Sequence, residues 1–240
     1  HSSSNAGDGT GTILIANGAA ITTANTAATL IGADFDFIGT LNTGSGNVTI
    51  GQSVTSQSLA LGSASSTLLT DTELDLITTT GTLTIGQATT AGSDGAGTSA
   101  STLTSAAITS DGLTLGSKNI ALVSGSTVDL GSLTTTGTLS VTSSGAVTDS
   151  GALAITGTTT IAAGSGNNIT LDNTSNNFQG AVSITTGNNV TLVDAGDIDL
   201  GASTVSGTYA VTATSGDITD SGTLTITGAA TFKTGADGSN

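Results

Sequence analysis

Short alternations of apolar and polar residues recur along almost the whole chain. Leu224–Ile226 (Leu-Thr-Ile) and Val190–Leu192 (Val-Thr-Leu) are typical, and Gly, Asn or Asp soon follows each one. Because successive side chains of a strand point to opposite faces, these triplets place Leu, Val and Ile on one face and Thr on the other. The triplets recur roughly every six to thirteen residues, which leaves room for a strand and a corner but not for a crossover helix. The pattern predicts many short strands.

One block of the sequence occurs twice. Asn119–Val123 resembles Asn189–Val193, and Leu153–Gly157 resembles Leu224–Gly228 after a one-residue insertion. The period of about 70 residues is too long for one coil of a solenoid and is about right for three coils in the low twenties of residues each. A block repeated in this way indicates stacked units, and we expect a single domain over residues 1–240.

The predicted fold is all-β, a right-handed parallel β-helix (β-solenoid). In such a coil the few inward Val, Ile and Leu side chains are covered by the next coil, about 4.8 Å away. A β-sandwich or an up-and-down barrel also uses many short strands, but the turn dipeptides here are irregular and no strand is long enough for a barrel wall. We expect roughly eleven coils, outward Thr ladders and open strand edges at the ends. Residues 87–107, rich in Ala, Ser, Thr and Gly, are expected to leave the rod as a loop.

The composition agrees with a narrow core. The 240 residues include no Cys, Met, Trp or Pro, and aromatic residues make up 2%, so the bulky side chains that fill a thick core are scarce. The net charge is -15, with Lys118 and Lys233 as the only basic side chains besides His1. This balance repels nucleic acid and anionic membranes. We therefore expect no nucleic-acid binding and no membrane insertion.

Groups of carboxylates are the candidate metal ligands, and Ca²⁺ is the one cofactor that they suggest. They are Asp71, Glu73 and Asp75; Asp194, Asp197 and Asp199; and Asp34 with Asp36. The first group is expected to alternate along a strand, so that its carboxylates share a face while Leu74 and Leu76 point inward. Neither an EF-hand loop nor a Gly-Gly-x-Gly-x-Asp nonapeptide accompanies them, so a solvated acidic face is the simpler interpretation.

The sequence offers no set of side chains for catalysis. Glycoside hydrolysis by paired carboxylates needs an apolar or aromatic cleft, and aromatic residues are few. A polysaccharide lyase needs a base and a cation, but His1 is terminal, Arg is absent and the two lysines are far apart in sequence. We predict that the protein is not an enzyme and has no catalytic or cofactor-binding residues.

The formula Gly-Thr-Leu-Thr-Ile at Gly81–Ile85, which returns at Gly222–Ile226, carries a family resemblance, together with Asn-Val-Thr-Leu and Asp-Ile-Asp-Leu variants. It resembles the repeat region of filamentous-haemagglutinin-like exoproteins, most clearly over residues 68–232. These are large bacterial adhesins exported by two-partner secretion or related outer-membrane routes. The resemblance implies a right-handed parallel β-helix, extracellular or cell-surface display, and a role in attachment or biofilm formation. The secretion domain of that family carries Asn-Pro motifs, and this chain has no proline.

The expected function is therefore that of a structural shaft segment in a surface or secreted adhesin. Its expected partners are further solenoid repeats of the same chain or of neighbouring copies, and a receptor that the sequence does not identify. Residues 1–4 show no signal-peptide pattern, which fits a fragment of a mature protein or a cytosolic protein. The sequence shows no amphipathic cap for the open strand edges at either end, so we expect a piece of a longer protein. The alternatives are a filament subunit that stacks through its open ends, and an ice-binding solenoid with Thr pairs as in Thr82–Thr84 and Thr223–Thr227. The irregular coil spacing argues against the flat array that ice binding requires.

Overall fold

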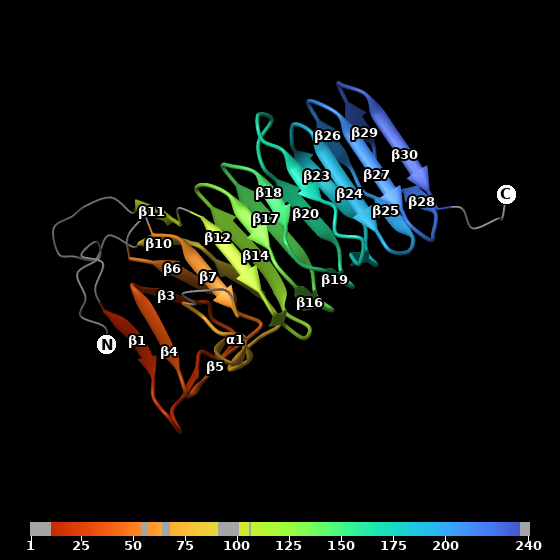
Figure 1. Cartoon of the computed structure of the whole chain (residues 1–240). Helices are drawn as coiled ribbons and strands as arrows, with labels where there is room; N and C mark the ends of the chain where they lie inside the picture. The colour runs from red at the N-terminus through yellow and green to blue at the C-terminus, as the bar shows by residue number, and fades with distance from the viewer. Residues whose placement is uncertain (1–10, 54–56, 64–67, 91–100, 106, 236–240) are drawn as a thin grey trace.

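The chain forms an elongated stack of about ten coils, with β1 (Thr12–Ile15) at one end and β30 (Ala230–Thr234) at the other (Figure 1). The computed structural model describes residues 11–53, 57–63, 68–90, 101–105 and 107–235. Among the strands in these ranges, every pairing is parallel except that of β10 with β11. The predicted all-β solenoid is confirmed.

Two long sheets form two sides of the stack. The eight-stranded sheet consists of β7 (Leu59–Gly62), β12 (Ile108–Asp111), β15 (Val128–Leu130), β18 (Val147–Asp149), β21 (Ile169–Leu171), β24 (Val190–Asp194), β27 (Tyr209–Ala213) and β30. The nine-stranded sheet consists of β3 (Ala28–Gly32), β6 (Val48–Gln52), β9 (Thr82–Ile85), β14 (Asn119–Ser124), β17 (Leu139–Ser143), β20 (Thr159–Ala162), β23 (Val182–Thr186), β25 (Ile198–Leu200) and β28 (Ile218–Asp220).

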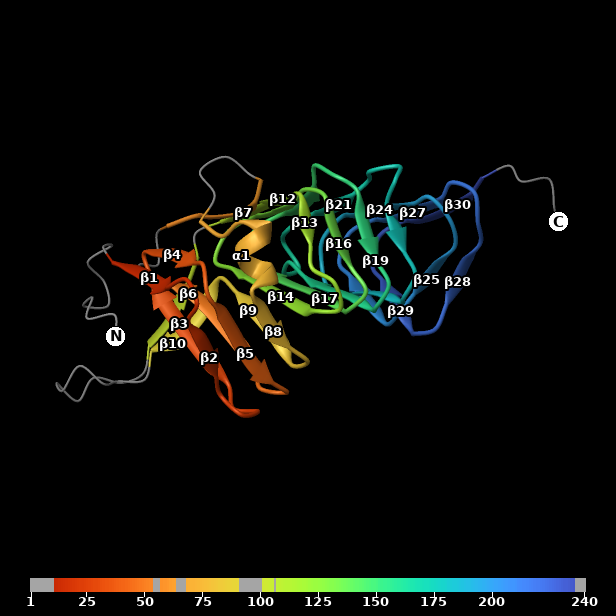
Figure 2. The ribbon, with the colours of Figure 1, turned by 90° about the horizontal axis from the view of Figure 1, so that it is seen from below.

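Shorter sheets complete the coils. They contain β2 (Ala20–Thr22), β5 (Thr40–Gly44) and β8 (Ile77–Thr79); β13 (Leu113–Thr114), β16 (Leu133–Thr135), β19 (Leu153–Ile155) and β22 (Asn177–Phe178); and β26 (Ser203–Val205) with β29 (Leu224–Ile226). β1 pairs with β4 (Asp34–Phe37), and the described helix is α1 (Asp71–Asp75). Each coil thus has three strands, as β12, β13 and β14 show (Figure 2). No helix in the described ranges is long and apolar enough to cross a membrane.

The core is a narrow column along the stack. On β24, Val190 and Leu192 are buried, while Thr191 between them is partly exposed. Most strands show this alternation, as the sequence predicts. The inward residues lie in register from coil to coil: Val128, Val147, Ile169, Val190 and Tyr209. Each coil therefore depends on its neighbours above and below to remove its apolar side chains from water.

The 70-residue duplication does not correspond to three coils. Register pairs carry Ile120 to Leu139, then to Thr159, and in the third coil to Val182. The sequence counterpart of Ile120 is Val190, eight residues beyond Val182 and on the eight-stranded sheet instead of the nine-stranded one. One copy of the duplication is therefore longer than three coils, by about one of the three sides of a coil.

The cause of this offset is the order of long and short strands. β14 and β17, with six and five residues, are each followed by two strands of three residues, and the four-residue β20 is followed by β21 with three residues and β22 with two. At β23 and β24, two five-residue strands follow one another directly. The long strands consequently move from the nine-stranded sheet to the eight-stranded sheet, and equivalent residues of the two copies face different sides of the rod.

The segment 87–107, expected to be a loop, includes two short strands. β10 (Gln87–Thr90) and β11 (Ser101–Thr104) pair antiparallel, and residues 91–100 and 106 lie outside the described part of the chain. The N–H of Ser105 donates to the carbonyl oxygen of Gly86 at 2.8 Å. The coil thus resumes beside the position at which the chain left it.

Candidate functional site

The first predicted acidic group lies on a helix, not on a strand. Thr70 begins α1 with a capping box: the N–H of Glu73 donates to Thr70 Oγ1 at 3.2 Å, and the N–H of Thr70 donates to Glu73 Oε2 at 2.8 Å. The prediction of an alternating strand through Asp71, Glu73 and Asp75 is therefore wrong. The sequence Thr-Asp-Thr-Glu carries the capping signature that would have indicated a helix start.

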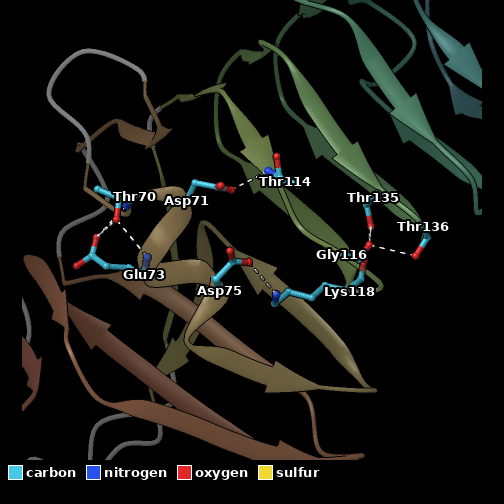
Figure 3. A network of polar contacts seen from close by, with 9 residues as sticks. All are labelled: Thr70, Asp71, Glu73, Asp75, Thr114, Gly116, Lys118, Thr135 and Thr136. Carbon is cyan, nitrogen blue, oxygen red and sulfur yellow. Dashed lines mark hydrogen bonds and ion pairs between the residues drawn. The ribbon is translucent and has the colours of Figure 1, made fainter. Parts of the chain in front are cut away.

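Each carboxylate of α1 contacts a group on an adjacent coil, and Figure 3 shows the contacts of Asp71 and Asp75. Asp71 Oδ1 accepts the N–H of Thr114 at 2.7 Å, and Asp75 Oδ1 lies 3.5 Å from Lys118 Nζ. On the preceding side, Glu73 Oε1 accepts the N–H of Phe37 at 3.1 Å. Leu74 is fully buried and Leu76 partly buried against the core, as predicted. The helix is inserted between β7 and β8, and its acids link this coil to the coils on either side.

The second predicted group also separates. Asp194 occupies an inward position at the end of β24 and is completely buried. Its two carboxylate oxygens accept backbone N–H groups at 2.7 Å, one from Phe178 and one from Gly196. Burial raises the pKa of Asp194, against the effect of these two hydrogen bonds. Asp197 Oδ1 accepts the N–H of Asp217 at 2.8 Å, and Asp199 is a partly exposed residue of β25.

The third pair, Asp34 and Asp36, lies on the outer face of β4, where both are exposed. Within the described ranges, no group of three or more His, Cys, Asp or Glu side chains is arranged to hold a metal ion. Four of the predicted acids, Asp71, Glu73, Asp194 and Asp197, instead accept backbone N–H groups of other segments of the chain.

Asparagine side chains at corners form a second set of links, which the sequence analysis missed. Asn119 Oδ1 accepts the N–H and the hydroxyl of Thr138 at 3.1 and 3.2 Å, and Asn189 Oδ1 accepts the same two groups of Thr208, both at 3.0 Å. The signal was present, because each Asn directly precedes an apolar–polar alternation. These amides hold the corner of one coil to the next coil.

The outer surfaces of the two long sheets carry the predicted Thr ladders, in which Ser, Ala and one Asp take some of the positions. On the eight-stranded sheet the ladder consists of Thr109, Asp129, Thr148, Thr170, Thr191, Ala210 and Thr231. On the nine-stranded sheet it consists of Thr29, Thr49, Thr84, Ala121, Ser140, Thr160 and Ser183. Both ladders stay in register although coils differ in length, because the corners absorb the difference.

Comparison with known proteins gives a family. Residues 117–185 and 187–238 each match the family described as repeats of unknown function, DUF5649. The chain belongs to this family, since the two matches together cover half of its residues. No curated protein and no solved structure matches the chain. The boundary between the matches falls between β23 and β24, where the coil pattern is offset, so one family repeat corresponds to the ten strands β14–β23.

Proposed function

We propose that this protein is a structural shaft segment of a large bacterial surface or secreted adhesin, and that it supports attachment or biofilm formation without catalysis. The observation that carries the proposal is the continuous core column, in which each coil is buried only by its neighbours. Such a stack can be lengthened by further repeats without change in its cross-section. A shaft that must hold a binding domain away from a cell surface needs this property.

The surface chemistry supports the same proposal. The outer ladders of the two long sheets present mostly Thr, Ser and Ala, and such small side chains offer few charged or aromatic groups that could bind a ligand tightly. The net charge of -15 keeps parallel rods apart and soluble. At about 4.8 Å per coil, ten coils extend the reach of an adhesin by roughly 48 Å. We also propose that the protein is exposed outside the cell and that it belongs to a longer, filamentous-haemagglutinin-like protein.

The test is surface display in the bacterium that makes the protein. Antibodies raised against residues 117–238 are applied to intact cells and to permeabilised cells, and attachment is measured with and without the gene. We expect labelling of intact cells, loss of that labelling after external protease treatment, and weaker attachment of the deletion strain. Labelling that requires permeabilisation would overturn the proposal.

A filament subunit is the second candidate, and the exposed apolar side chains of the last described coil favour it. Sedimentation over a wide concentration range distinguishes the two candidates. A shaft segment stays monomeric, whereas a subunit elongates with concentration.

A further inference from the structure

The last described coil contains a set of apolar side chains that its counterpart in the first repeat keeps buried. In the first repeat the set is Val147, Leu153, Ile155 and Ile161, each at most 1% exposed. The duplication aligns these with Ile218, Leu224, Ile226 and Phe232. The first three are only partly buried, and Phe232 is 48% exposed. Equivalent inward side chains of the two repeats therefore differ in burial: those of the first repeat are covered by a following coil, and those of the second are not.

What covers the first set is a single coil. β21 pairs with β18, β22 with β19, and β23 with β20. In the described ranges no strand lies on the free edge of β28, β29 or β30. The family match explains the difference. The first copy extends over 117–185, but the second, 187–238, contains no counterpart of residues 169–186.

We propose that the face formed by β28, β29 and β30 binds one further coil of the family repeat, built like residues 169–186. This inference rests on the proposed shaft function, because it treats the face as an internal joint of a longer stack. The β21-like strand lies on β28, the β22-like strand on β29 and the β23-like strand on β30.

The side chains of the incoming coil follow from the first repeat. There Val147 is paired with Ile169, Ile155 with Phe178, and Ile161 with Ile184. The incoming counterparts of Ile169, Phe178 and Ile184 therefore cover Ile218, Ile226 and Phe232. Residues 169–186 contain one acid, Asp172, and no base, so the coil adds little repulsion to a strongly negative rod. Because β30 belongs to the eight-stranded sheet, the long strand of this coil extends that sheet.

The test uses the full chain and a thiol probe. At the offset of 71 residues that aligns Ile161 with Phe232, Ser239 corresponds to Asn168 and Asn240 takes the position of Ile169, so a second copy of Ile169–Gly187 is joined after Ser239 in place of Asn240. The chain has no cysteine, and Phe232→Cys introduces one reactive thiol on the inward face. We expect the extension to slow labelling of this thiol by about tenfold or more, because labelling then requires local opening. The extension should also raise the unfolding midpoint by at least about 3 °C.

Two controls make the result specific. Lys233→Cys places the thiol on the outer face of β30, and its labelling should be equally fast with and without the extension. An extension in which the copies of Ile169, Leu171, Phe178, Val182 and Ile184 are changed to Ser should protect neither thiol.

Two results would overturn the inference. The first is that the extension leaves the labelling rate of Phe232→Cys unchanged. If electron microscopy shows that the extended protein is still an intact rod, this result rejects the binding of a further coil but leaves the shaft proposal standing. The other is concentration-dependent protection of Phe232→Cys in the chain without the extension. That result would assign the face to a second copy of the protein.

Discussion

The buried carboxylate of Asp194 accepts the backbone N–H of Phe178 at 2.7 Å, and this bond joins two consecutive coils at the point where the strand order is offset. β22 has only two residues, so little of its backbone is held by a ladder. The other oxygen of Asp194 accepts the N–H of Gly196 in the following corner. An inward acid thus supplies the acceptors that strand pairing leaves out, at the cost of burying a carboxylate.

The first prediction concerns the effect of this burial on pH dependence. The pKa of Asp194 is raised in the folded protein above its ordinary value of 3.8, so the folded state binds the proton more tightly than the unfolded chain. Stability is therefore highest below the ordinary pKa and declines as pH rises through the raised pKa. We expect the thermal unfolding midpoint to increase when the pH is lowered from 7 towards roughly 4.

Asp194→Asn separates this contribution from the general repulsion of a chain with net charge -15. The variant should show a shallower rise of the midpoint on acidification, measured by circular dichroism at successive pH values. At pH 7 it should be less stable by about 1–3 kcal/mol, because the amide has one acceptor for two buried N–H groups. Asp149, whose pKa is also raised by burial, keeps its contribution in both proteins. Equal pH dependence of the two proteins would contradict the assignment.

The second prediction concerns the capping box of α1. Thr70→Ala removes the acceptor for the N–H of Glu73 and should cost about 1 kcal/mol. The effect should be local, with faster hydrogen exchange at the amides of Phe37 and Thr114, which bond to the acids of the helix. Thr72→Ala, at an exposed position of the same helix, is the matched control and should leave both amides protected.

The general architecture could be predicted because it depends on a local rule repeated many times. Val190, Thr191 and Leu192 take the inward, outward and inward positions that their alternation predicts, and the register of neighbouring coils follows from burying the apolar pair. The carboxylates could not be placed in this way. The alternation of Val190 and Leu192 continues to Asp194 and places it inward, but the pattern does not show that the N–H groups of Phe178 and Gly196 are there for a buried carboxylate to accept.

The offset between repeats was missed for a different reason. A period of 70 residues divides plausibly into three coils, and only the register pairs from Ile120 to Val182 show that three coils take fewer residues. The sequence does contain the cause, since the five-residue strand Val182–Thr186 is followed directly by Val190–Asp194. Strand lengths are difficult to read in a chain so rich in Thr and Gly, because these residues occur in strands and corners alike.

The third prediction separates the core column from the outer ladder on a single strand. Leu192 is fully buried between Leu171 and Val211 of the adjacent coils, so Leu192→Ala should destabilise the protein by about 2–5 kcal/mol. Thr191→Ala alters only the outer face and should change stability by about 0.5 kcal/mol or less. Urea denaturation of both variants provides the comparison. Similar losses for the two variants would mean that the ladder, and not the column, holds the coils together.

The last prediction concerns Tyr209, the only tyrosine of the chain. Its side chain is fully buried and packs edge-on against Phe232 with ring centroids 6.0 Å apart, but its hydroxyl has no hydrogen-bond partner among the described residues. Burial raises its pKa to about 12, so stability should decline as pH rises from roughly 10 towards 12.

Tyr209→Phe should match or exceed the wild type in stability at pH 7, because a buried polar group without a partner is removed. It should also lose the alkaline decline, which thermal unfolding between roughly pH 9 and 12 measures. Tyr209→Ala, which removes the ring as well, should cost about 3–5 kcal/mol. A marked loss of stability in Tyr209→Phe would show that the hydroxyl is hydrogen-bonded in solution.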